Sequence, residues 1–128
     1  MTLLIRLLPA ALLALAPADA LRAGPPDAPV AEIVTFRLDT ATPEAAFLAA
    51  ARATGPLLAA APGFVSPRLS RGADGTWTDH VEWSSLAEAE AAARAILSDP
   101  AAGPFLAAID PSTIVMRHEA LHWTLGAD

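Results

Sequence analysis

The sequence contains no cysteine and no lysine. Without cysteine the chain can form no disulfide framework, thiolate metal site, cysteine nucleophile or lipid-modified cysteine. The eight basic residues are scattered arginines, and 14 acidic residues outnumber them. The net charge of −6 therefore carries no electrostatic footprint for nucleic acid and argues against an anionic membrane surface. A length of 128 residues with 54% hydrophobic content suits one folded domain and argues against a disordered chain.

The first 20 residues have the pattern of a secretory signal peptide. Arg6 supplies a positive charge, an apolar run follows, and Ala18 and Ala20 are the small residues that a signal peptidase reads. The run between Arg6 and Asp19 has 12 residues, too few for a transmembrane helix of about 20. A buried N-terminal helix, or a start codon placed too far upstream, is the alternative. We expect cleavage after Ala20 and a periplasmic or secreted protein without a membrane anchor.

Residues 21–29 (LRAGPPDAP) are predicted to form an extended leader, because three prolines and one glycine in nine residues disfavour both sheet pairing and helix. The folded domain is then predicted to span residues 30–128, since no repeat, charge block or second linker follows. The chain is thus divided into a signal peptide (1–20), a proline-rich leader (21–29) and one domain.

Hydrophobic periodicity and turn residues predict the element order β-α-β-β-α-β. Thr42-Pro43-Glu44 has the residues of a helix start, with the threonine as cap, and Ser85 with Glu88 forms a capping box before the second helix. The predicted strands cover residues 31–38, 64–71, 76–84 and 114–123, with a hairpin turn at 72–75. The predicted helices cover 42–61 with a break at Gly55-Pro56, 85–97, and a short piece between 99 and 110.

This order predicts an α+β, ferredoxin-like fold in which a four-stranded antiparallel sheet has both helices on one face. Such a domain leaves the second face of its sheet uncovered, and an uncovered face of that size needs a partner. We therefore expect a homodimer.

Residues 30–123 resemble the dimeric α+β barrel superfamily, and within it the antibiotic biosynthesis monooxygenase-like domain. Three motifs in the expected order carry the resemblance: Ala61–Phe64 (APGF), Asp74–Trp77 (DGTW) and Val81–Leu86 (VEWSSL). The resemblance implies that two protomers pack sheet faces into a barrel whose cavity binds small, often aromatic molecules. It also implies oxidation with oxygen and no cofactor in some members, and binding and degradation of haem in others.

The sequence departs from the haem-degrading members. Those proteins use an asparagine on the first strand and a histidine associated with the second helix, whereas this chain has no asparagine and no histidine in residues 86–109. Many members also carry a histidine soon after the strand that ends in tryptophan, where residues 87–94 of this sequence are only Ala, Glu and Arg. We therefore expect no cofactor, and the resemblance transfers the fold better than the activity.

Strand alternation separates a helix-facing side from an outward side. Val34, Phe36, Val81, Trp83 and Met116 are predicted to pack under the helices. The outward side then presents a set of charged residues that could bind the polar edge of a ligand: Arg37, His80, Glu82 and Arg117, together with Arg68. His80, titrating near neutrality beside Glu82, is the candidate catalytic residue. The alternative is a set of self-neutralising charges in water or at a dimer contact.

Residues 118–122 (HEALH) spell the H-E-x-x-H zinc signature, which works only on a helix. Ile114 and Val115 favour a strand, in which positions four apart lie about 13 Å from each other. His118 and His122 could not then share an ion with Zn–N bonds of about 2.0–2.1 Å. We therefore expect no metal site.

Two functions remain open. One is an exported protein that resembles cofactor-independent monooxygenases and oxidises a small apolar or aromatic compound in the dimer cavity. The other is a non-catalytic homodimer with a structural or stress-related role in the periplasm. Neither function involves nucleic acid, nor a membrane once the signal peptide is cleaved.

Overall fold

The computed structural model describes residues 27–126, and its central feature is a four-stranded sheet. The strands are β1 (Val30–Phe36), β2 (Phe64–Arg71), β3 (Trp77–Trp83) and β4 (Val115–Ala120), in the spatial order β2-β3-β1-β4. Every neighbouring pair is antiparallel, so the predicted ferredoxin-like α+β fold is confirmed. The predicted signal peptide lies outside the described residues.

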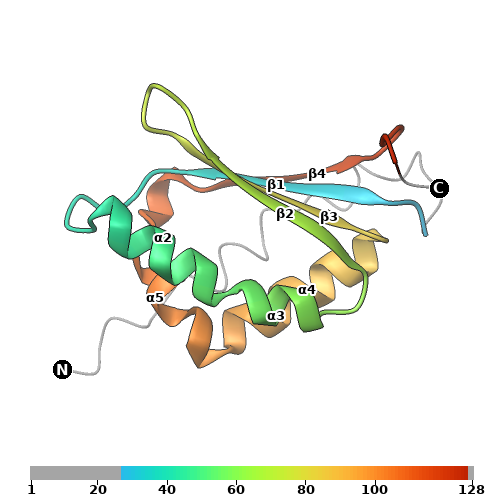
Figure 1. Cartoon of the computed structure of the whole chain (residues 1–128), viewed down its shortest axis with the longest axis horizontal. Helices are drawn as coiled ribbons and strands as arrows, with labels where there is room; N and C mark the ends of the chain where they lie inside the picture. Colours follow the sequence, from blue (N-terminus) through green and yellow to red (C-terminus); the bar gives the residue numbers. More distant parts are fainter. Residues whose placement is uncertain (1–26, 127–128) are drawn as a thin grey trace.

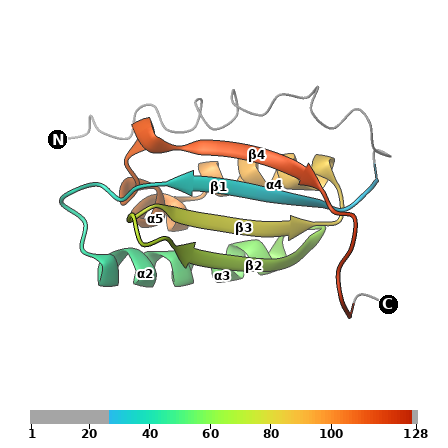
Figure 2. The same ribbon diagram turned by 90° about the horizontal axis from the view of Figure 1, so that it is seen from above.

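The helices lie on one face of this sheet (Figures 1 and 2). They are α2 (Glu44–Ala53), α3 (Gly55–Ala60), α4 (Leu86–Ser98) and α5 (Gly103–Ala107), with short 3₁₀ turns at Pro100–Ala102 and Pro111–Thr113. Among residues 27–126 no helix has the length and apolar character needed to cross a membrane.

The cap residue of α4 is the predicted one, whereas the cap residue of α2 differs from the prediction. Ser85 caps α4 as predicted, since its hydroxyl oxygen accepts a hydrogen bond from the Glu88 backbone N–H at 3.2 Å. The prediction that Thr42 caps α2 is wrong: the cap position is Pro43, without a side-chain hydrogen bond. Pro43 is extended (ψ 143°), so the helix begins one residue later and Thr42 lies outside it.

The predicted break in the first helix is confirmed. Thr54 ends α2, and its hydroxyl donates to the Ala51 carbonyl at 2.7 Å. Pro56 in the first turn of α3 needs no partner for its missing N–H, so the chain restarts as a helix with a change of direction.

Three strands are shorter than predicted, and β3 lacks only one residue at each end of its predicted range. β1 ends at Phe36, and Leu38 forms only an isolated bridge with Ile109. β4 ends at Ala120, after which the Leu121 N–H donates to the Pro29 carbonyl. Strand length depends on pairing with the neighbouring strand as well as on local composition. At its other end β1 begins at Val30, one residue before the predicted start.

The core lies between sheet and helices and consists of two separate clusters. The first contains Val30, Val81, Trp83, Ala89 and Ala92, and the second contains Phe36, Phe47, Trp77, Ala108 and Ile109. The second cluster is held by edge-to-face aromatic contacts, with the Phe47 and Trp77 ring centroids 4.8 Å apart. The predicted alternation is confirmed, since Val34, Phe36, Val81, Trp83 and Met116 lie on the helix side.

Candidate functional site

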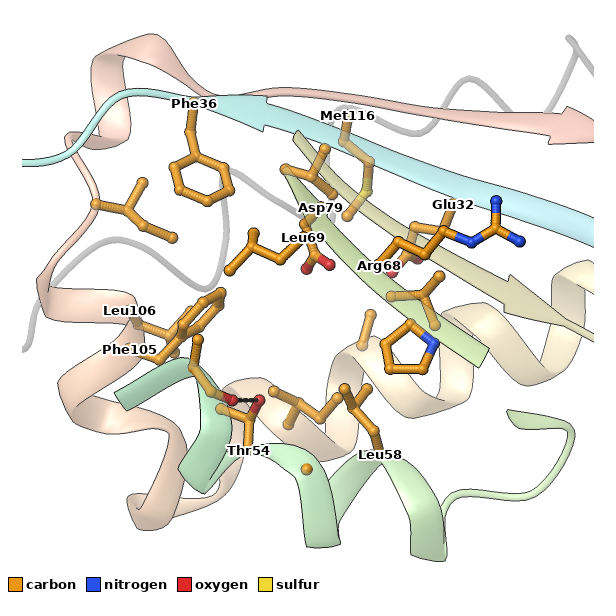
Figure 3. Close-up of a pocket in the computed structure, with 18 of the residues that line it drawn as sticks. Glu32, Phe36, Thr54, Leu58, Arg68, Leu69, Asp79, Phe105, Leu106 and Met116 are labelled. Carbon is orange, nitrogen blue, oxygen red and sulfur yellow. Dashed lines mark hydrogen bonds between the residues drawn. The ribbon is translucent and has the colours of Figure 1, made fainter. Parts of the chain in front are cut away.

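A cavity of about 420 Å³ lies between the sheet and the helices (Figure 3). Its walls are mainly aliphatic and aromatic, with Leu58, Leu106 and Phe105 on the helix side and Val34, Leu69 and Met116 on the sheet side. A cavity of this size, with apolar walls and few polar groups, is typical of a small-molecule site.

Two carboxylic acids stand on the sheet side of this cavity. The helix-facing residues of β1 are Val30, Glu32, Val34 and Phe36, and those of β3 are Trp77, Asp79, Val81 and Trp83. Each of these central strands therefore interrupts its apolar stripe with one acid. Glu32 pairs with Val81 and Asp79 with Val34, so the two acids are diagonal neighbours on adjacent strands.

Asp79 has the most strongly shifted pKa of the residues in the site. Burial among apolar side chains raises its pKa from 3.8 to about 7, and the nearby Glu32 carboxylate adds to the rise. No cation within residues 27–126 forms an ion pair with Asp79. A carboxyl group that titrates near neutrality in an apolar cavity can both accept and donate a proton.

Glu32 has a partner on the other side. Nε2 of His118 donates to Oε2 of Glu32 at 2.9 Å, and the two side chains are only 5% and 12% exposed. The two residues are directly opposite each other on β4 and β1. Asp79 has no such partner within residues 27–126, and its carboxyl group is directed into the cavity (Figure 3).

The arginines at this cavity lie at its border. Arg52 on α2 and Arg68 on β2 line it and are exposed. Arg68 forms an ion pair with Glu82 at 3.9 Å. Polar groups from the helices are few, and the hydroxyl of Thr54 is engaged with the backbone of α2.

Four of the residues predicted to bind a ligand lie outside this cavity, namely Arg37, His80, Glu82 and Arg117, and the fifth, Arg68, lies at its border. His80 and Glu82 occupy the opposite side of β3, where Arg68 pairs across from His80 and reaches Glu82. Nδ1 of His80 is buried and has no hydrogen-bond partner in the described part of the chain. The structure thus brings His80, Glu82 and Arg68 together, and their role in binding or catalysis stays a prediction.

The other two predicted residues make local contacts. Arg37 lies just beyond β1 and donates to the backbone carbonyl of Asp74 in the hairpin at 2.9 Å. Arg117 donates to Glu119 on its own strand at 2.7 Å. Neither arginine reaches the cluster around His80 through a hydrogen bond or ion pair between described residues.

The strand assignment of the H-E-x-x-H segment is confirmed for residues 118–120 and wrong for residues 121 and 122. His118 lies on β4, and His122 follows the end of the strand. No group of three His, Asp or Glu side chains in residues 27–126 is arranged to hold a metal ion. His118 is instead the partner of Glu32.

Sequence reasoning missed Glu32, Asp79 and His118 as site residues. A signal was present, because an acid at an inward position of an otherwise apolar strand face is costly unless it serves a purpose. Glu32 and Asp79 have the same parity as Val34 and Val81, which were correctly placed under the helices.

Comparison with known proteins gives structural similarity at low sequence identity. No protein-family model and no curated protein sequence matches the chain. Among solved structures it resembles SnoaB, a cofactor-independent oxygenase from Streptomyces nogalater, with a TM-score of 0.54 and 20% identity over 77% of this chain and 98% of that one.

Two further structures show the same fold. A hydroxynitrile lyase from Passiflora edulis has a TM-score of 0.55 and 20% identity over 79% of this chain and 99% of the lyase. A candidate antibiotic biosynthesis monooxygenase from Chloroflexus aurantiacus has a TM-score of 0.54 and 14% identity over 78% of this chain and 99% of that one. The chain therefore has the ferredoxin-like α+β fold of the antibiotic biosynthesis monooxygenase-like proteins, as its sequence motifs implied.

Proposed function

We propose that this protein binds a small, mainly apolar molecule in the cavity between sheet and helices and exchanges a proton with it through Asp79. The observation that carries the proposal is the placement of Asp79, an acid with a pKa of about 7 directed into apolar walls. An apolar wall binds the body of the ligand by burial, and a single polar group orients it. Aromatic ligands suit this cavity because Phe36 and Phe105 line it.

The proposed chemical step is proton abstraction. The ionised Asp79 carboxylate takes a proton from an O–H or an acidic C–H of the ligand, so that this bond breaks, a carboxyl O–H forms and the ligand becomes an anion. Near pH 7 Asp79 is present in both forms, which is the condition for efficient acid–base exchange.

A ligand anion of this kind can undergo more than one reaction, and the reactions of proteins with the same fold support one choice among them. The related structures include a cofactor-independent oxygenase and a hydroxynitrile lyase, and one fold can support several chemistries. We propose the oxygenase class, in which the ligand anion is the reductant and dioxygen is the oxidant and co-reactant. A C–O bond forms between the ligand and one oxygen atom, the O–O bond breaks, the oxidised carbon becomes a carbonyl, and the other oxygen atom leaves as water with the two protons that the ligand has lost. Oxidation of an aromatic ligand then requires no group beyond those of the cavity and dioxygen.

A pair of probes tests the binding step. 2-Naphthol carries an ionisable hydroxyl on the same rings as naphthalene, so binding of the two to the full chain is compared by fluorescence titration between pH 5 and 9. We expect both to bind, and the preference for 2-naphthol to change with pH around the pKa of Asp79. Asp79→Asn should remove the pH dependence, and Val34→Phe should abolish binding of both probes by filling the cavity.

Asp79 and His80 provide a matched comparison on adjacent positions of one strand. Asp79 faces the cavity, whereas His80 lies on the opposite side of the sheet. The proposal requires Asp79→Asn to lose the pH-dependent component of 2-naphthol binding. It also requires Asp79→Asn to lose the oxygen uptake that wild type shows with 2-naphthol. If His80→Ala lost the pH-dependent binding and the oxygen uptake while Asp79→Asn kept them, the proposal would be refuted and the site would be placed on the outward face of the sheet. Failure of both probes to bind wild type would favour the non-catalytic structural role.

We also propose that the protein is exported and forms a homodimer. Export is supported by the sequence of residues 1–20, and N-terminal sequencing should find Leu21 as the first residue. The dimer is supported by helices that lie on only one face of the sheet and by exposed apolar residues at and after β4, namely Val115, Trp123 and Leu125. Sedimentation of the mature chain should give twice the protomer mass, and a stable monomer at micromolar concentration would contradict the dimer.

A further inference from the structure

Three ionisable side chains form a row across the sheet on the side of the cavity. His118 on β4 is directly opposite Glu32 on β1, and Asp79 on β3 is the diagonal neighbour of Glu32 on its other side. The residues come from strands far apart in the sequence, with Glu32 and His118 separated by 86 positions. Glu32 is therefore the central member of the row, with His118 on one side and Asp79 on the other.

The hydrogen bond between His118 and Glu32 fixes the central member. When Glu32 is ionised its carboxylate can only accept, so Nε2 of His118 is then the donor across the distance of 2.9 Å. Both side chains are almost fully buried, so water cannot replace the hydrogen bond at little cost. Without His118, Glu32 would lose the only side-chain donor that it has within the described residues.

We propose that His118 is a positioning residue: it holds the Glu32 carboxylate next to Asp79, so that the proton of the cavity is carried by Asp79. Glu32 acts on Asp79 through its charge and does not itself meet the ligand. The inference rests on the proposed function only for the use that is made of this proton.

The surroundings leave Glu32 as the main charge that acts on Asp79. Arg52 on α2 and Arg68 on β2 border the cavity, but both are exposed and Arg68 is paired with Glu82. The cavity-lining residues of α3, α4 and α5 have no ionisable side chain: Gly55, Leu58, Ala93, Ile96, Leu97, Phe105 and Leu106. The rise in the pKa of Asp79 has burial as its larger cause and Glu32 as its smaller one.

The experiment measures the titration of Asp79 directly, without any ligand. The carboxyl carbons of the ¹³C-labelled full chain are followed by NMR between pH 3 and 9, and the signal of Asp79 is identified by its absence in Asp79→Asn. Glu32→Gln should lower the midpoint of Asp79 by less than half of its rise from 3.8 to about 7, because burial persists. His118→Phe should lower it by a similar amount, since a displaced or protonated Glu32 no longer repels the Asp79 carboxylate.

Rescue and epistasis separate positioning from a merely structural role. In His118→Gln the side-chain amide can donate from near the position of Nε2, so the midpoint should return toward that of wild type. The double variant Glu32→Gln/His118→Phe should titrate like Glu32→Gln alone, because His118 acts only through Glu32. His122→Gln is the matched control, since His122 is exposed beyond the strand, and it should leave the midpoint unchanged.

Defined results would overturn the inference. An unchanged midpoint in His118→Phe, or a higher one, would show that His118 does not act through Glu32. Equal midpoints in His118→Gln and His118→Phe would show that the donor is irrelevant. If His118→Phe does not fold, His118→Leu takes its place as the variant without a donor. Because no ligand is present, failure of 2-naphthol to bind would refute the proposed function while leaving these titrations intact.

Discussion

The burial of Asp79 should make the stability of the protein depend on pH in a way that one substitution removes. Asn has nearly the same shape as Asp but no charge at any pH, so Asp79→Asn keeps the packing of the cavity wall. The folded pKa of about 7 exceeds the ordinary value of 3.8 by about 3 units, and one unit corresponds to about 1.4 kcal/mol. The ionised group should therefore destabilise the folded state by up to about 4 kcal/mol.

The direction of the effect follows from the bound protons. Below pH 3.8 Asp79 is protonated in the folded and the unfolded chain, and it does not lower the free energy of unfolding. Between pH 3.8 and about 7 the unfolded chain has released this proton while the folded chain retains it, so stability decreases as the pH rises. Above pH 7 both states are ionised and the full destabilisation is present.

Urea denaturation of wild type and Asp79→Asn at pH 4, 5, 6, 7 and 8 measures this contribution. The difference between the two proteins isolates Asp79 together with its interaction with Glu32, because the other ionisable residues titrate in both. We expect Asp79→Asn to be close to wild type at pH 4 and more stable by as much as about 4 kcal/mol at pH 8. A difference that stays constant over this range, or that favours wild type at high pH, would refute the burial of a neutral carboxyl group at this position.

Three further predictions concern stability, each measured by urea denaturation. Hydrogen bonds from the Thr76 backbone and hydroxyl lower the pKa of Asp74, so Asp74→Asn should be destabilising at pH 7, and the difference should fade as the pH falls below about 4; persistence at pH 2 would contradict this. Gly63→Ala should cost at least about 1–3 kcal/mol, because Gly63 has φ +80° and an added Cβ would lie 2.8 Å from Cβ of Glu88, whereas its control Gly55→Ala has open space and should gain about 0.5 kcal/mol. Ser85→Ala should cost about 1 kcal/mol through loss of the cap of α4, and an unchanged midpoint would show that the cap contributes nothing.

Much of the fold could be predicted because its signals are local. The break at Gly55-Pro56, the cap at Ser85 and the alternation that places Val81 under the helices each depend on a few neighbouring residues. The start of α2 could not be settled in this way. Thr42 and Pro43 both suit a helix start, and only the backbone shows that Pro43 is the cap residue.

The site was harder to predict, since its members become neighbours only in the folded chain. The sequence indicated an ionisable group on the sheet and directed attention to His80, whose charged neighbours Arg68 and Glu82 do lie beside it. It gave no measure of the cavity on the other side of the same strand, where Asp79 is found.

The sequence by itself determined the order of helices and strands and the side of the sheet on which each strand residue lies, because backbone alternation and capping act over a few positions. Tertiary structure decided whether an inward position is filled or open. The helices pack against both ends of the sheet through two separate clusters and leave a cavity between them, into which Asp79 points. It also decided that His118 and Glu32, 86 positions apart, share a hydrogen bond. Desolvation and charge proximity are properties of the assembled packing, so the pKa of Asp79 was set by residues distant in the sequence.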